Sequence, residues 1–136
     1  PDNYEILINL KKKENIILIT DSMRASGMKP GEYNLGGQNV IVDEKSARLE
    51  SGVLAGSILR QNKAVYNFWK NTDLNLPEVI DMVSKIPAES LNISETKGTL
   101  EVGLDADISI FDENLDVYMT ISEGGTIFKK RLKYDR

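Results

Sequence analysis

The sequence of 136 residues contains no histidine and no cysteine. Without cysteine it can form neither a disulfide bond nor a thiolate metal site. The missing histidines exclude more, because a self-contained zinc hydrolase normally needs imidazole ligands and a serine triad needs a histidine base. An enzyme of either class would need these groups from elsewhere. The sequence also starts without methionine, which we interpret as a fragment or a trimmed chain.

Long apolar runs and a basic excess are also missing. No apolar stretch approaches the roughly 20 residues that a membrane-spanning helix needs, and the first residues do not resemble a signal peptide. The net charge of −4 argues against a nucleic-acid surface, which needs a basic stripe. We therefore expect a cytoplasmic protein that binds neither nucleic acid nor a membrane.

The chain does contain a short apolar run that ends in a carboxylate. Residues 16–20 include four consecutive aliphatic side chains, which predict a strand buried on both faces, as in a parallel sheet. Asp21 follows directly, at the end of the strand where α/β folds gather catalytic groups. Taken alone, such an aspartate is more often a helix cap or turn residue. A short helix is predicted at residues 4–13, with an apolar face formed by Ile6, Leu7 and Leu10.

A small β-rich insertion is predicted after Asp21. A loop over residues 24–31 is indicated by its glycines and proline, and Gly36-Gly37 predicts a hairpin turn. Insertions beyond a strand of a sheet or barrel are usually lids or pocket walls. Three short strands are expected, at residues 33–35, 39–42 and 47–49.

Residues 52–57 place two glycines around small apolar residues, and a helical pattern follows immediately. Gly56 lets a ligand or backbone approach closely, and a helix N-terminus here would offer free N–H groups to a ligand. The alternative is that Gly52 and Gly56 belong to an ordinary loop and cap region. Asn75 and Glu78 have the spacing of a capping box and predict a second helix.

The last third of the chain predicts a small β unit. Strands are expected at residues 107–112, 117–122 and 126–130, with the last two joined in a hairpin at residues 123–125. This pattern differs from the helical middle of the chain. We therefore predict a domain boundary near Lys97, which separates residues 1–97 from residues 98–136.

Three motifs occur in a fixed order: Ile-Thr-Asp-Ser-Met at 19–23, Tyr-Asn-Leu-Gly-Gly-Gln at 33–38, and Gly-Val-Leu-Ala-Gly-Ser at 52–57. Together they resemble the C-terminal part of the N-acetylglucosamine-6-phosphate deacetylase family, within the amidohydrolase superfamily. Residues 97–107 resemble the return into the small β domain of that superfamily. The resemblance implies an α/β fold, in which residues 1–97 are the C-terminal part of a TIM-like (β/α)8 barrel. Residues 98–136 would then be strands of a small β-sandwich domain.

The resemblance also implies a function. The family hydrolyses N-acetylglucosamine 6-phosphate to glucosamine 6-phosphate and acetate, using a divalent metal such as zinc or iron. Asp21 matches the catalytic carboxylate, which can act first as a base and then as an acid, while the metal polarises the carbonyl. Leu54, Ala55 and Gly56 match positions that contact the sugar. The metal ligands would lie upstream, with Asp21 a minor additional ligand, so the fragment alone is expected to be inactive.

Three residues near these motifs have other expected roles. Ser57 lacks a histidine base, so we expect it to start a helix rather than to act as a nucleophile. Met23 is expected to pack at the pocket floor, and Ser22 stands where alanine is commoner in the family. The full-length enzyme is expected to be a homodimer.

Two alternative functions remain open for the sequence. One is another amidohydrolase, such as a dihydroorotase-like enzyme or an amino-acid deacetylase, and the other is a non-catalytic binding or assembly module.

Overall fold

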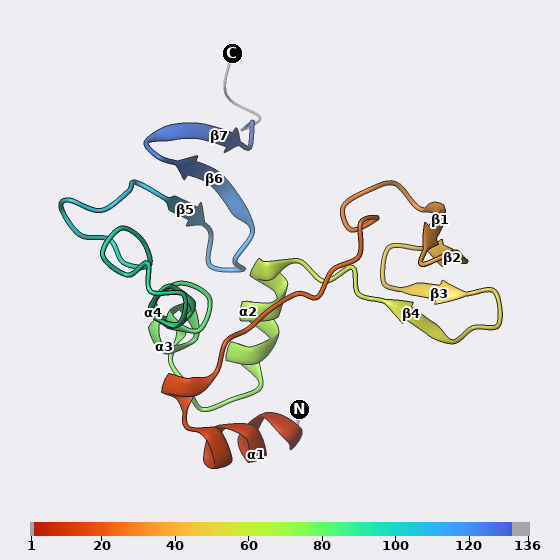
Figure 1. Cartoon of the computed structure of the whole chain (residues 1–136), viewed down its shortest axis with the longest axis horizontal. Helices are drawn as coiled ribbons and strands as arrows, with labels where there is room; N and C mark the ends of the chain where they lie inside the picture. The colour runs from red at the N-terminus through yellow and green to blue at the C-terminus, as the bar shows by residue number, and fades with distance from the viewer. Residues whose placement is uncertain (1, 132–136) are drawn as a thin grey trace. The chain divides into compact units, whose positions relative to one another are not determined.

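The computed structural model describes residues 2–131, and the chain forms two compact units. One unit is continuous, over residues 19–64, and the other joins the residues up to 18 to those from 65 onward. Figure 1 shows the elements of both units. In chain order these are α1 (Asp2–Lys11), the 3-10 helix η1 (Lys13–Asn15), β1 (Gly31–Leu35), β2 (Gln38–Val42), β3 (Ala47–Leu49), β4 (Leu54–Gly56), α2 (Gln61–Lys70), α3 (Leu76–Asp81), α4 (Lys85–Ser90), β5 (Ile108–Phe111), β6 (Val117–Ser122) and β7 (Gly125–Lys129).

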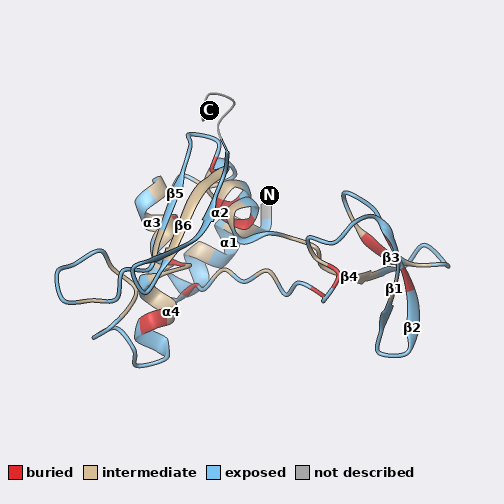
Figure 2. Ribbon diagram, turned by 90° about the horizontal axis from the view of Figure 1, so that it is seen from above, coloured by how far each residue is buried: buried red, intermediate tan, exposed pale blue. Residues whose placement is uncertain are grey.

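The 19–64 unit is built on a four-stranded antiparallel sheet in the order β1-β2-β3-β4. The turn between β1 and β2 is Gly36-Gly37, and both glycines have positive φ, as a tight hairpin requires. The side chain of Asn34 accepts a hydrogen bond of 3.0 Å from Gly37 N and closes this turn. The predicted hairpin and third strand are confirmed. Buried residues on β2 and β3 form the core of the unit (Figure 2), with Val40, Val42 and Ala47 packed beside Met23 and Ala25.

The strand β4 was not predicted. It pairs with β3, where Gly56 lies opposite Ala47 and Leu54 opposite Arg48 around a bulge. The expectation that a helix opens directly after residue 57 was wrong, because α2 begins only at Gln61. The reason is physical: a three-residue strand containing glycine has little strand propensity of its own, and pairing with β3 decides its conformation.

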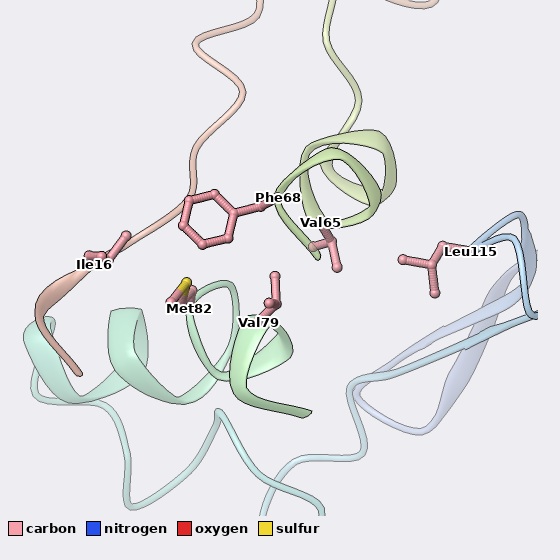
Figure 3. Packing of buried hydrophobic residues seen from close by; sticks show 6 residues of the cluster. All are labelled: Ile16, Val65, Phe68, Val79, Met82 and Leu115. Carbon is pink, nitrogen blue, oxygen red and sulfur yellow. The ribbon is translucent and has the colours of Figure 1, made fainter. Parts of the chain in front are cut away.

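The other unit has a helical core. Phe68 and Val65 on α2 pack with Val79 on α3 and with Met82 (Figure 3). The predicted capping box is confirmed, since Glu78 N donates to the Asn75 side chain (3.0 Å) and Asn75 N donates to Glu78 Oε2 (2.8 Å). Lys13 Nζ also pairs with Glu78, which joins η1 to the start of α3.

Residues 16–20 form no strand in the described part of the chain, so this prediction was wrong for this structure. Ile16 is buried in the helical core and Leu18 N donates to the carbonyl of Met82 (3.1 Å). However, Ile17 is 41% exposed and Ile19 is 69% exposed, so the run is not buried on both faces. A central parallel strand needs a neighbouring strand on each side, and both sheets of the described chain are made of other residues.

The helix α1 forms as predicted, but it does not bury the expected face. Tyr4 and Ile8 pack against the core, and the ring of Tyr4 lies 4.8 Å from that of Phe68. The side chains of the expected apolar face, Ile6, Leu7 and Leu10, are exposed. With Ile16 and Ile17, part of this face lines an open hollow. Apolar surface of this kind usually marks a place that another part of a protein covers.

The C-terminal strands form an antiparallel sheet in the order β5-β6-β7. Its hairpin turn places Glu123 and Gly124 at φ +49° and +80°, the left-handed conformation of a tight turn. The predicted strands are confirmed, with β7 beginning one residue earlier than expected.

Lys97 holds the loop before this sheet together. Its ammonium group lies 2.8 Å from Asp105 Oδ2 and 2.6 Å from Asp107 Oδ2. The other oxygen of Asp107 accepts hydrogen bonds from Glu123 N (2.8 Å) and the Ser122 hydroxyl (3.2 Å), so Asp107 connects Lys97 to the hairpin turn. Hydrogen bonds to Asp105 and Asp107 raise the pKa of Lys97. The bond from Lys97, followed by that from Glu123 N, lowers the pKa of Asp107.

We expect this cluster to stabilise the protein only between acid and strongly alkaline pH. Asp107 has a lowered pKa in the folded state, so its contribution is present above the ordinary aspartate pKa and is lost as the pH falls through the lowered value. Lys97 has a raised pKa, so its contribution is present below the ordinary lysine pKa and is lost as the pH rises through the raised value. Urea unfolding midpoints at pH 7 and pH 3 should therefore differ less in Asp107→Asn than in the wild type. Glu113→Gln, at an exposed position, is the control, and an unchanged pH dependence in Asp107→Asn would contradict the prediction.

Candidate functional site

The 19–64 unit brings two of the sequence motifs together. Ser22 and Ser57 form an isolated parallel bridge, although 34 residues separate them along the chain. Met23 N donates to the carbonyl of Ser57 at 2.8 Å. The backbone that carries Asp21 therefore runs beside Ser57, the residue directly after β4, which consists of the candidate sugar contacts Leu54, Ala55 and Gly56.

Asp21 is exposed and has a left-handed backbone, with φ at +47°. Aspartate adopts this conformation occasionally, more often than most residues other than glycine. Among the described residues, none makes a hydrogen bond or ion pair with its carboxylate. The turn at residues 24–27 follows closely, and Asp21 does not cap it. The ordinary role of a turn or cap residue is therefore not supported, and the carboxylate is available to a ligand.

Two serine hydroxyls connect the segments on either side of the bridge, and a third forms a bond within one of them. Ser22 Oγ donates to the carbonyl of Leu59, and Ser26 Oγ donates to the carbonyl of Ile58 at 3.3 Å. Ser57 Oγ accepts a hydrogen bond of 3.1 Å from Leu59 N. Ser57 thus stabilises a local turn. The expectation that Ser57 starts the following helix was wrong, because α2 begins at Gln61.

Gly56 lies where no side chain would fit easily. A Cβ atom at this position would be 3.3 Å from both Met23 Sδ and Leu35 Cδ2. Met23 is itself buried in the core of the unit, as predicted for a packing residue. Ala55 is half-buried against the same core and Leu54 is exposed. Packing within the unit is therefore sufficient to explain the glycine, and Leu54 is the most accessible of the three candidate sugar contacts.

The residues described do not form a metal centre. Over residues 2–131 there is no group of three or more histidine, cysteine, aspartate or glutamate side chains that could hold an ion. Asp21 therefore does not belong to a cluster of potential metal ligands among these residues. A metal at this site would require ligands that the described residues do not provide.

A separate hollow of about 220 Å³ lies within the same unit and was not predicted. Asp43 at its edge accepts hydrogen bonds from the backbone N–H groups of Lys45 and Ser46, and these bonds lower its pKa. The sequence carried no signal for this hollow, because its walls come from three separate segments. It is lined by Ala25, Gly27, Met28, Pro30, Val42, Asp43, Glu44, Ile58 and Arg60.

Comparison with known proteins identifies a family. The sequence model of the amidohydrolase family matches residues 5–127. The chain is 48% identical over 120 residues to an N-acetylglucosamine-6-phosphate deacetylase from Lysinibacillus sphaericus, covering 88% of this chain and 31% of that protein. It is 38% identical over 112 residues to a putative N-acetylgalactosamine-6-phosphate deacetylase from Escherichia coli, covering 82% of this chain and 67% of that protein. The chain thus spans about a third of the length of the first relative.

A solved structure is also similar. The crystal structure of N-acetylglucosamine-6-phosphate deacetylase from Thermotoga maritima aligns with a TM-score of 0.82 and 36% identity. The alignment covers 95% of this chain and 35% of that chain. Within residues 2–131, no helix has the length and apolar character needed to cross a membrane.

Proposed function

This chain belongs to the amidohydrolase family, and from that membership we propose that it is part of a deacetylase of N-acetylglucosamine 6-phosphate. The products would be glucosamine 6-phosphate and acetate. The observation that carries the proposal is the accessible, unpaired carboxylate of Asp21, held beside the segment that follows β4. The similarity to proteins named N-acetylglucosamine-6-phosphate deacetylase supports the same activity.

We also propose that the chain is the C-terminal part of the enzyme. Residues 1–97 would complete a TIM-like barrel, with residues 16–20 as its eighth strand, and residues 98–136 would belong to a small β-sandwich domain. The exposed side chains of Leu7, Leu10 and Ile17 support this proposal, because the missing barrel would cover them. In the absence of neighbouring barrel strands, residues 16–20 have no sheet to enter.

Asp21 would transfer protons during hydrolysis. Its carboxylate would accept a proton from the attacking water as the new C–O bond forms at the acetamide carbonyl. The resulting carboxylic acid would then donate this proton to the nitrogen as the C–N bond breaks, releasing the amine and acetate. A divalent metal, zinc or iron, would have to be held by ligands outside the described residues.

Residues 54–56 would contact the sugar. Leu54 is accessible and could lie against the substrate, while Ala55 and Gly56 pack on the core and would contribute mainly their backbone. The phosphate would be bound by residues elsewhere in the full-length protein. We further propose that the full-length enzyme is a cytoplasmic homodimer.

A substrate panel assayed with the full-length enzyme tests the proposed function. We expect kcat/KM for N-acetylglucosamine 6-phosphate to exceed that for N-acetylgalactosamine 6-phosphate by about tenfold or more, because a misplaced hydroxyl leaves polar groups unpaired. Unphosphorylated N-acetylglucosamine, dihydroorotate and an N-acetyl amino acid complete the panel. The 136-residue chain with added zinc is the negative control, and we expect no activity from it.

Each alternative function predicts a different result in this panel. A preference for the galactosamine epimer would assign the substrate named for the Escherichia coli relative. A preference for dihydroorotate or the acetylated amino acid would indicate another amidohydrolase. Failure to hydrolyse any substrate with metal bound would favour a non-catalytic binding or assembly module.

A further inference from the structure

We propose that Ser22 is a positioning residue for Asp21, acting through the hydrogen bond from its hydroxyl to the carbonyl of Leu59. This proposal rests on the proposed catalytic role of Asp21. The backbone bridge to Ser57 would remain intact with glycine or alanine at position 22. Neither the family motif nor the fold therefore requires a hydroxyl at this position.

The need for a positioning residue follows from the surroundings of Asp21. Its carboxylate is exposed and, among the described residues, no hydrogen-bond donor fixes its direction. The backbone alone therefore orients it, through the left-handed conformation at φ +47°. A conformation of this kind persists only where the neighbouring structure holds it, so the residues next to Asp21 determine where the carboxylate points.

The residues after Asp21 are held to one segment by backbone and side-chain hydrogen bonds. Within the parallel bridge between Ser22 and Ser57, Met23 N donates to the Ser57 carbonyl at 2.8 Å, and Ser22 Oγ donates to the Leu59 carbonyl. The bridge uses only the backbone, which any residue at position 22 provides. The hydroxyl of Ser22 is the one contact that a substitution can remove without disturbing the others.

Packing beneath these contacts makes the backbone on the opposite side of the bridge rigid. Met23 is buried, and a Cβ atom on Gly56 would lie 3.3 Å from its Sδ and 3.4 Å from its Cβ. Gly56 therefore packs closely on Met23, next to the residues that Ser22 contacts. The hydrogen bond from Ser22 to Leu59 is a second attachment to this segment, two residues beyond the bridge at Ser57. Two attachments restrict rotation of the peptide that follows Asp21 more than the bridge alone would.

The test uses the full-length, metal-loaded enzyme with N-acetylglucosamine 6-phosphate. In Ser22→Ala we expect kcat to fall by about tenfold with KM unchanged, because misplacing a catalytic group by less than about 1 Å is sufficient for such a loss. Ser22→Thr keeps the hydroxyl and should restore kcat to within about twofold of the wild type. Metal content and the thermal unfolding midpoint should be unchanged in both variants.

Ser26→Ala is a matched control. Its hydroxyl also donates to a carbonyl of the same segment, that of Ile58, but Ser26 does not adjoin Asp21. We expect kcat of this variant to equal that of the wild type. An equal loss of kcat in Ser26→Ala, or an equal loss in Ser22→Ala and Ser22→Thr, would overturn the positioning role.

The outcome for Ser22 can be separated from that for the proposed function. If Asp21→Asn is inactive and Ser22→Ala has the kcat of the wild type, the positioning role is wrong and the catalytic role of Asp21 stands. If Asp21→Asn keeps its activity, the catalytic assignment fails, and the positioning role fails with it.

Discussion

Replacing Asp21 by asparagine in the full-length enzyme should lower kcat by about 10²-fold to 10⁴-fold, the usual contribution of a positioned acid or base. Asparagine cannot accept the proton from water and cannot return it to the leaving nitrogen. It does, however, tolerate the left-handed conformation that Asp21 adopts at φ +47°. The substitution therefore removes the proton transfer while keeping the backbone, which alanine at this position would not do.

The measurement is steady-state deacetylation of N-acetylglucosamine 6-phosphate together with metal content. We expect KM to change little, because the carboxylate acts in the chemical step, and we expect metal content to remain near normal. Glu123→Gln is the matched control: it also changes a carboxylate to an amide at an exposed residue with positive φ, here +49°. If Asp21→Asn retained most of its turnover, the catalytic role would have to be given up.

Local sequence signals predicted much of the fold. The Gly36-Gly37 turn and the capping box of Asn75 and Glu78 are each decided by residues that are close in the sequence, and the structure contains both. The C-terminal hairpin was predicted for the same reason, since Gly124 supplies the positive φ that its turn needs. Such elements need no distant partner in order to form.

Elements that depend on distant partners were predicted poorly. Residues 16–20 have the composition of a buried parallel strand, but neither sheet of the described chain includes them. The strand β4 has little propensity of its own and forms because β3 lies beside it. The expected apolar face of α1 is exposed for a related reason: periodicity shows which residues can be buried, but not whether anything is present to bury them.

The candidate site shows the same division. The motif around Asp21 could be found in the sequence, and so could that around Gly56, because each is a contiguous set of residues. The hydrogen bond from Ser22 to Leu59 joins residues 37 positions apart, and nothing near Ser22 in the sequence indicates its partner. The orientation of Asp21 likewise depends on a φ angle that aspartate adopts only occasionally.

Gly98 is the position where we expect a single methyl group to destabilise the protein most. A Cβ atom at this residue would lie 2.7 Å from Ala88 Cβ and 3.3 Å from both Lys85 Cα and Ser84 O. These neighbours belong to α4 and its N-cap, so they cannot rotate away as the end of a flexible side chain could. The helix would have to move, and overpacking of this kind typically costs about 1–3 kcal/mol.

The backbone of Gly98 adds a second cost, since its φ of +107° is unfavourable for any L-residue. Gly103 separates the two effects: its φ is +101°, but a Cβ atom there would meet nothing within 4 Å. We expect Gly103→Ala to lower the free energy of unfolding by about 1–2 kcal/mol through backbone strain alone, and Gly98→Ala to lower it by about 2–5 kcal/mol through strain and overpacking together. Urea unfolding of the full-length protein measures both. Equal losses in the two variants would mean that α4 shifts freely and that overpacking at Gly98 adds no cost.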